Sequence, residues 1–120
     1  MSVRGGLLLW SLLVLAGLVG VSAWATGIVS IVPAIQDLLQ NPAAGYNPWT
    51  IATLFDAYFG FLWFWLWIAY RERSLAARIA WLPAVLLLGN IAMACYMLKV
   101  LWSLPPGAGV RELLLRPGSA

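Results

Sequence analysis

The sequence predicts an all-α integral membrane protein with three transmembrane helices joined by short connections. Hydrophobic residues make up 63% of the 120 residues and charged residues only 9%, whereas about 25% of a soluble domain is charged. The apolar residues gather in three long segments, at about 7–32, 49–70 and 75–104. Each is long enough to cross a bilayer, which takes about 20 residues. The length allows one domain, so residues 1–120 are expected to form a single membrane domain.

The first segment, 7–32, has two interpretations. Its start, "MSVRGG" followed by an apolar run and "VSA", resembles a signal peptide with a cleavage site. The apolar run continues past Ala23, however, which favours a retained spanning helix. Small residues recur at spacings of four, three and four along one face of this helix and predict a helix-packing seam. These residues are Ala16, Gly20, Ala23 and Gly27. The seam is expected to contact another helix of the chain or a partner protein.

Prolines interrupt the chain before the second segment, and "PAIQDLLQ" at 33–40 predicts a short helix lying in the membrane interface. The second segment, 49–70, carries ten aromatic residues. They point all around a helix, so several must face lipid or partner chains. We expect contact with a lipid, a quinone or a pigment through Trp63, Trp65 and Trp67, beside ordinary packing against lipid.

The third segment, 75–104, follows a tight "RERS" turn and is expected to run antiparallel to the second. After it, residues 105–120 begin with Pro-Pro and predict a loose tail. Three spanning helices place Arg4, Arg71, Arg73 and Arg78 on one side and Lys99, Arg111 and Arg116 on the other. By the positive-inside rule, the N-terminus lies inside and the C-terminus outside a bacterial inner membrane.

Asp56 is the charged residue inside the second segment. A carboxylate at the centre of a membrane helix costs about 2.5–3.5 kcal/mol, so it should face other helices and have a partner. Asn90 and Lys99 of the third segment are the two candidate partners, and Gly60, one turn beyond Asp56, would let a helix or a ligand approach closely. The group is either a site for a proton, an ion or a polar head group, or a polar clamp between helices.

Composition also excludes several kinds of function. The chain has no histidine and one cysteine, so no hydrolase triad, metal centre or internal disulfide is expected. We therefore expect no enzyme and no cofactor. The basic residues form no stripe, which argues against nucleic-acid binding. The expected partners are the lipid bilayer and other membrane protein subunits.

Two stretches resemble a known family. They are "IATLFDAYFGFLWFWLWIAYRERS" at 51–74 and "LLLGNIAMACYMLKVLWSLPP" at 86–106. The "FDAYFG" string, the "YRE" turn and the "GN" pair carry the resemblance. The family consists of small, uncharacterised bacterial membrane proteins with relatives in plants, catalogued as a domain of unknown function. The resemblance implies a three-helix integral membrane protein and no established activity.

Two functions follow as expectations. The first is a non-catalytic accessory subunit of a larger membrane complex of the respiratory or photosynthetic type. Small size, missing catalytic residues, the small-residue seam and surplus aromatic residues favour it. The alternative is a protein that binds a small molecule, a proton or an ion, or a transporter component. This alternative would be centred on Asp56 and built as a homo-oligomer.

Overall fold

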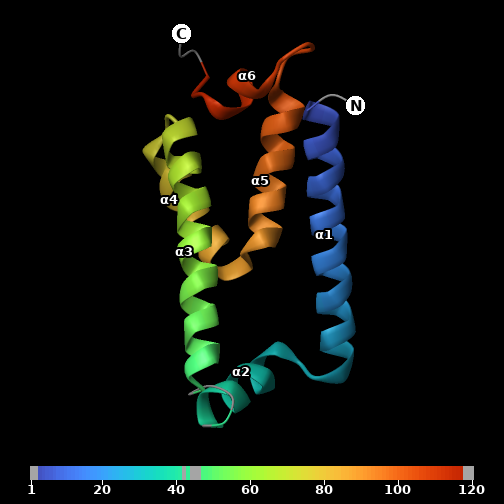
Figure 1. The fold of residues 1–120 in the computed structure, drawn as a ribbon, viewed down its shortest axis with the longest axis vertical. Coiled ribbons are helices and arrows are strands. Elements are labelled where there is room, and N and C mark those ends of the chain that lie inside the picture. The colour runs from blue at the N-terminus through green and yellow to red at the C-terminus, as the bar shows by residue number, and fades with distance from the viewer. Residues whose placement is uncertain (1–2, 42, 44–46, 118–120) are drawn as a thin grey trace.

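The structure, a computed structural model, describes residues 3–41, 43 and 47–117. These residues form six helices and no strand, which confirms the all-α class (Figure 1). The helices are α1 (Val3–Ile28), α2 (Ile31–Gln40), α3 (Pro48–Arg71), α4 (Leu75–Leu88), α5 (Asn90–Ser103) and α6 (Val110–Leu114).

Among the described residues two helices, rather than the predicted three, are long and apolar enough to cross a membrane. At 1.5 Å per residue, α1 and α3 are about 39 and 36 Å long, and the hydrocarbon core of a bilayer is about 30 Å thick. The third predicted span, 75–104, is wrong. It is divided into α4 and α5, which have 14 residues each and reach only about 21 Å.

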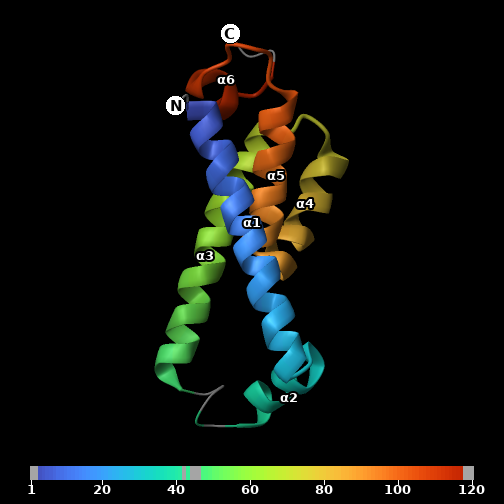
Figure 2. The ribbon, with the colours of Figure 1, turned by 90° about the vertical axis from the view of Figure 1, so that its right-hand side faces the viewer.

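The division occurs at Gly89, where the chain turns back on itself. Gly89 has φ +56° and ψ −125°, a conformation open to glycine but not to residues with a Cβ atom. The ring of Phe61 lies 2.8 Å from the position a Cβ atom would take there. As a result α4 and α5 form a hairpin that returns to the end of the molecule where it began (Figures 1 and 2).

The hairpin stands between the two long helices. Helix α1 packs against α5, α5 against α4, and α4 against α3. Tyr96 of α5 is fully buried in the core, and its ring makes edge-to-face contacts with Phe64, Trp67 and Trp81. The core therefore lies in the half of the molecule that holds the hairpin.

The opposite half has little packing within the chain. Within residues 16–28 of α1, all residues are exposed except Leu18 and Ala25, which are half-buried. Within residues 48–60 of α3, only Thr50 and Ala57 are half-buried and the others are exposed. Helix α2 crosses this end between the two long helices (Figures 1 and 2). It matches the short helix predicted at 33–40.

The predicted small-residue seam lies in this half and is unused within the described chain. Its four members, Ala16, Gly20, Ala23 and Gly27, are exposed. No atom approaches within 4 Å of a Cβ placed at Gly20 or Gly27. The expected packing against the second or third predicted helix is therefore wrong, because the hairpin contacts another stretch of α1, nearer its N-terminus.

Candidate functional site

All seven Lys and Arg residues lie at one end of the molecule, together with the described ends of the chain (Figure 1). We call it the basic end. It comprises Arg4 on α1, Arg71 on α3, Arg73 and Arg78 at the start of α4, Lys99 on α5, and Arg111 and Arg116 at α6. Glu72 and Glu112 also lie there, which gives a net charge of +5, and Asp37 and Asp56 contribute −2 elsewhere.

This arrangement corrects the predicted topology. Residues 3 and 117, the first and last that the structure describes, lie at the same end of the molecule, whereas the predicted topology separates the two ends of the chain. The prediction divided the basic residues four against three because it took 75–104 for one continuous span. The reversal at Gly89 brings Lys99, Arg111 and Arg116 back to the end that holds Arg4.

Arg71 organises the basic end by fixing α6. It is 6% exposed, and its Nη1 lies 2.7 Å from the carbonyl oxygens of both Leu113 and Leu115 and 3.1 Å from that of Glu112. Carbonyl groups in the last turn of a helix have no donor within the helix, and a cation placed there is favourable. The guanidinium of Arg71 thus supplies the donors that the end of α6 lacks.

Further side chains hold the same segment against α3. The indole of Trp67 donates to the carbonyl of Leu114 at 3.1 Å. The guanidinium of Arg116 donates to the carbonyl of Tyr70 at 2.6 Å, and Arg73 Nε donates to that of Pro117 at 3.1 Å. The predicted loose tail is therefore wrong for residues 105–117, and 118–120 lie outside the described residues.

Glu112 stabilises the other end of α6. The backbone N–H of Gly109 donates to Glu112 Oε2 at 2.7 Å. This hydrogen bond favours the ionised carboxylate and holds the pKa of Glu112 below its usual value.

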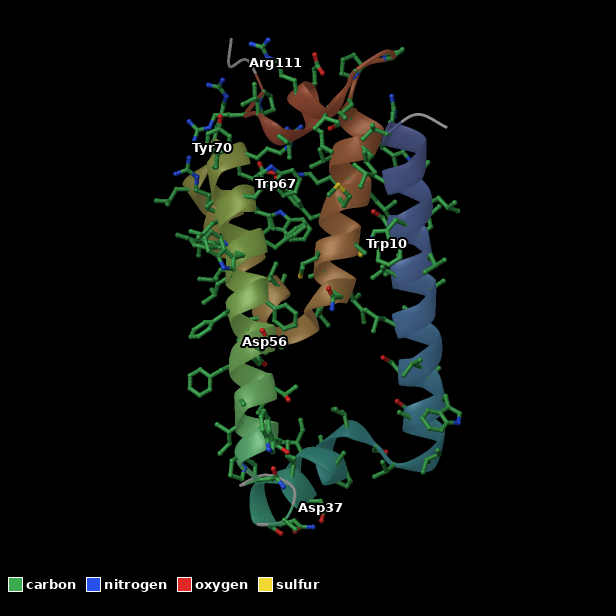
Figure 3. The ribbon with its side chains drawn as sticks, viewed as in Figure 1. Trp10, Asp37, Asp56, Trp67, Tyr70 and Arg111 are labelled. Carbon is green, nitrogen blue, oxygen red and sulfur yellow. The ribbon has the colours of Figure 1, made fainter. Side chains whose placement is uncertain are left out.

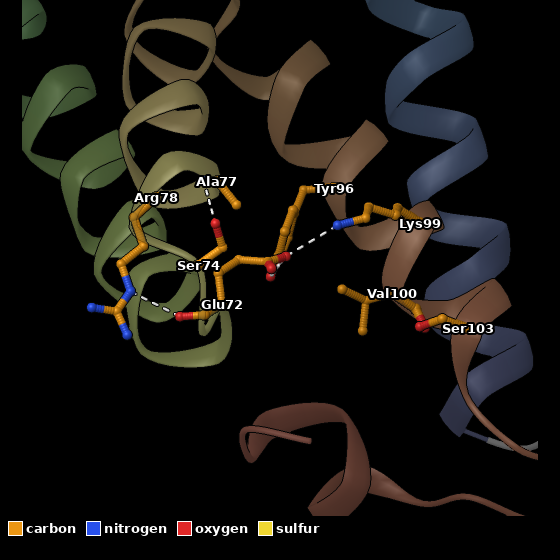
Figure 4. Close-up of polar contacts among 8 residues, drawn as sticks. All are labelled: Glu72, Ser74, Ala77, Arg78, Tyr96, Lys99, Val100 and Ser103. Atoms are coloured by element: carbon orange, nitrogen blue, oxygen red, sulfur yellow. Dashed lines mark hydrogen bonds and ion pairs between the residues drawn. The ribbon is translucent and has the colours of Figure 1, made fainter. Parts of the chain in front are cut away.

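Glu72 joins the hairpin to the turn after α3 (Figure 4). Its Oε1 accepts hydrogen bonds from Tyr96 Oη and Lys99 Nζ, each at 3.1 Å. Its carbonyl oxygen accepts from Arg78 Nε at 2.8 Å. The ion pair of Lys99 with Glu72 replaces the predicted pair of Lys99 with Asp56, which is wrong.

Asp56 lies away from the basic end, well below Trp67 and Tyr70 on α3 (Figure 3). It is exposed and makes no hydrogen bond or ion pair with any described residue. If residues 75–104 formed one continuous helix antiparallel to α3, Lys99 would lie near Asp56. After the reversal, Lys99 lies nine residues from Asn90 in the opposite direction, about 14 Å along α5.

The other predicted members of this group also remain apart from Asp56. Asn90 is the first residue of α5 and is exposed, and its side chain makes no hydrogen bond within the described chain. Gly60 is exposed, and a Cβ atom placed there would meet nothing within 4 Å. The structure therefore offers Asp56 and Gly60 to an outside group and brings neither Asn90 nor Lys99 to the carboxylate.

The three tryptophans expected to contact a lipid, a quinone or a pigment divide into two kinds. Trp63 is 75% exposed. Trp65 and Trp67 are half-buried, and their indole N–H groups donate to the carbonyls of Arg78 and Leu114. The surface open to an external apolar molecule is therefore Trp63, and the other two pack within the chain.

A groove of about 530 Å³ runs between α1, α5 and Phe64 of α3. Its walls include Trp10, Ser11 and Gly17 of α1 and Asn90 of α5. Ser11 and Asn90 are its polar side chains, and it has no charged one. Elsewhere, the described residues contain no group of three or more His, Cys, Asp or Glu side chains that could hold a metal ion.

No family model, curated protein or solved structure matches this chain. The resemblance of residues 51–74 and 86–106 to a family of small membrane proteins therefore stays a prediction. Three features of the structure bear on function: the basic end, the half of the molecule away from it, and the groove between α1 and α5.

Proposed function

We propose that the chain is an integral membrane protein in which α1 and α3 cross the bilayer and the α4–α5 hairpin enters and leaves from the basic end. Only 6% of the most apolar stretch of each long helix is buried inside the chain. Soluble proteins rarely expose apolar surfaces of this extent, and a bilayer would cover them. The non-helical turn of the hairpin also suits this placement, because Gly89 is buried against Phe61 and irregular backbone is tolerated at membrane depth where protein covers it.

The charge distribution supports an orientation with the basic end in the cytoplasm. Cytoplasmic ends of membrane proteins carry an excess of Lys and Arg, and here all seven lie at one end. Both ends of the described chain are then cytoplasmic, and α2 lies on the other side of the membrane.

This topology predicts the reactivity of introduced cysteines. In a Cys95→Ser background, Ala43→Cys beside α2 should react with an impermeant maleimide added to intact cells. Val110→Cys, at an exposed position of α6 in the basic end, should react only after the membrane is opened. The reverse pattern, or equal labelling of both positions from outside, would contradict the proposed orientation.

Within the membrane, we propose that the chain is a non-catalytic accessory subunit whose partner covers the half away from the basic end. The observation that carries this proposal is the exposed and unpaired Asp56 on a half of α3 that has almost no packing within the chain. Because an unpaired carboxylate is costly in a bilayer, a partner subunit that supplies a hydrogen-bond donor or a cation would stabilise it. Gly20 and Gly27, which have free space above them, would let a partner helix approach α1 closely.

The alternative, a proton or ion site centred on Asp56, has less support. Asn90 and Lys99, the groups expected to complete such a site, do not bond to Asp56. A carboxylate without a second polar group from its own chain is better explained by a partner that supplies one.

Asp56→Ala should release the chain from its complex. Mild detergent extraction, native-gel separation and mass spectrometry should find the unmodified chain in a large assembly of fixed composition and Asp56→Ala at the size of the free protein. Asp37→Ala removes the other carboxylate outside the basic end and should leave the assembly intact. The proposal is wrong if the unmodified chain migrates alone, or if Asp56→Ala stays bound.

A further inference from the structure

The groove between α1 and α5 has the character of a site for a neutral, mainly apolar molecule. Its volume of about 530 Å³ falls within the range of about 300–1,000 Å³ typical of small-molecule pockets. No charged side chain lines it, so it offers nothing to a charged head group. The groove is distinct from Asp56 and Gly60, which do not line it.

Ser11 provides the first indication of a specific ligand. It is only 3% exposed and lines the groove, yet its hydroxyl makes no hydrogen bond within the described part of the chain. Every described side-chain nitrogen or oxygen atom that is fully buried has a hydrogen-bond partner, so the unbonded Ser11 oxygen is not sealed in the core but opens into the groove. An oxygen atom of a bound molecule would accept the hydrogen bond that this hydroxyl can donate.

Asn90 adds donors deeper in the groove. Its amide is unbonded within the described chain and can donate two hydrogen bonds. It is also the first residue of α5, whose first backbone bond of helical spacing runs from Met93 N to Gly89 O. The N–H groups of Asn90 and the next two residues therefore lack partners within the helix. Of these residues Asn90 lines the groove, so its donors are available to an acceptor such as a carbonyl oxygen.

The depth of Asn90 in the membrane distinguishes a phospholipid from a lipid whose neutral head group carries the carbonyl groups. Asn90 is 13 residues from the basic end of α5, about 20 Å along the helix. The ester carbonyls of phospholipids lie at the membrane interface, outside a hydrocarbon core of about 30 Å. A neutral head group that dissolves in the hydrocarbon can reach this depth, and the rings of Trp10 and Phe64 in the groove wall can pack against a flat ring.

We propose that the groove binds a lipid-soluble quinone, with its ring carbonyls accepting hydrogen bonds from Ser11 and Asn90 and its tail lying along the apolar wall. This inference rests on the proposed placement in a membrane and not on the proposed partner subunit. It concerns binding and involves no electron transfer by the chain.

The experiment uses the full chain in phospholipid nanodiscs, titrated with a short-tailed benzoquinone while tryptophan fluorescence is recorded. Saturable quenching is expected, in part from Trp10. Gly17→Leu should raise the apparent dissociation constant at least tenfold, because its side chain would fill the groove while a Cβ atom there meets nothing within 4 Å. Gly20→Leu is the matched control for quinone binding, measured on the chain in nanodiscs without a partner subunit. It has the same free space but lies outside the groove wall, so it should bind quinone as the unmodified chain does.

Ser11→Ala should weaken binding about fivefold, as expected for the loss of one hydrogen bond of about 1 kcal/mol. The proposal is wrong if quenching does not saturate, or if Gly17→Leu binds equally well. Native mass spectrometry gives a third test. The proposal is also wrong if the unmodified chain carries a phospholipid that quinone does not displace and that is missing from Gly17→Leu. Migration of Gly17→Leu on the native gel separates this test from the partner proposal, because that variant should remain in its complex.

Discussion

Gly89→Ala is expected to unfold the α4–α5 hairpin, at a cost of about 2–5 kcal/mol from backbone strain and overpacking together. Alanine disfavours the positive φ of +56° at this position, and its Cβ atom would lie 2.8 Å from the Phe61 ring. Both effects destabilise the turn between α4 and α5, and neither destabilises α1. Thermal unfolding in detergent, followed by near-ultraviolet circular dichroism, should show a lower midpoint, while the far-ultraviolet helix signal of α1 and α3 persists.

Two variants test the physical cause. Gly20→Ala places the same methyl group in free space on a regular helix, and it should be neutral or stabilising. Combining Gly89→Ala with Phe61→Ala removes the collision and retains the backbone strain. The double variant should therefore lose less stability than the sum of the single changes. Strict additivity would show that the contact between Gly89 and Phe61 does not exist, and a neutral Gly89→Ala would contradict the hairpin itself.

Arg71→Leu is expected to detach α6 and the chain after it. The substitution leaves the carbonyl oxygens of Leu113, Leu115 and Glu112 without the donor that now lies within 3.1 Å. Each buried carbonyl left unsatisfied costs about 1–3 kcal/mol, so the segment should gain more by moving into water. Trypsin cleavage after Arg111 should be at least tenfold faster than in the unmodified chain.

The matched substitutions separate charge from geometry. Arg71→Lys keeps the charge but not the guanidinium geometry, so it should give an intermediate cleavage rate. Arg73→Leu removes an exposed arginine of the same end that bonds only to Pro117 near the end of the described chain, and it should have a small effect. Unchanged cleavage in Arg71→Leu would mean that other contacts suffice to hold α6.

The two long helices could be predicted from sequence to within four residues at each end, but the reversal of the chain within the third segment could not. The apolar composition of residues 75–104 fits one span of 30 residues and fits a hairpin of two shorter helices equally well. The choice depends on Gly89 meeting Phe61, 28 positions earlier in the chain, and a linear pattern does not contain such a contact. The glycine in "LLLGN" is the one local signal, since a glycine inside a helical pattern can cap and end a helix, as Gly89 does for α4.

The errors about polar residues follow from that reversal or from contacts distant in sequence. A continuous third segment would bring Lys99, one of the two candidate partners, near Asp56, and the reversal at Gly89 removes that pairing. Arg71 was counted only as a topology signal, whereas its partners Leu113 and Leu115 lie more than 40 residues away. Asp56 was correctly singled out as a charge in an apolar helix, but the structure gives it no partner in its own chain.

The connection between Arg71 and α6 has a consequence for how the protein is made. Residues 110–117 are the last described part of the chain to leave the ribosome, yet they supply the carbonyl groups that Arg71 binds. During synthesis the guanidinium therefore lacks these partners until residues 110–117 have left the ribosome. In the proposed topology, the hairpin enters the membrane from the side of the basic end, and α6 packs against α3 afterwards. A chain that stops before residue 110 would lack the carbonyl groups that Arg71 binds, so the end of α3 would have none of these contacts with α6.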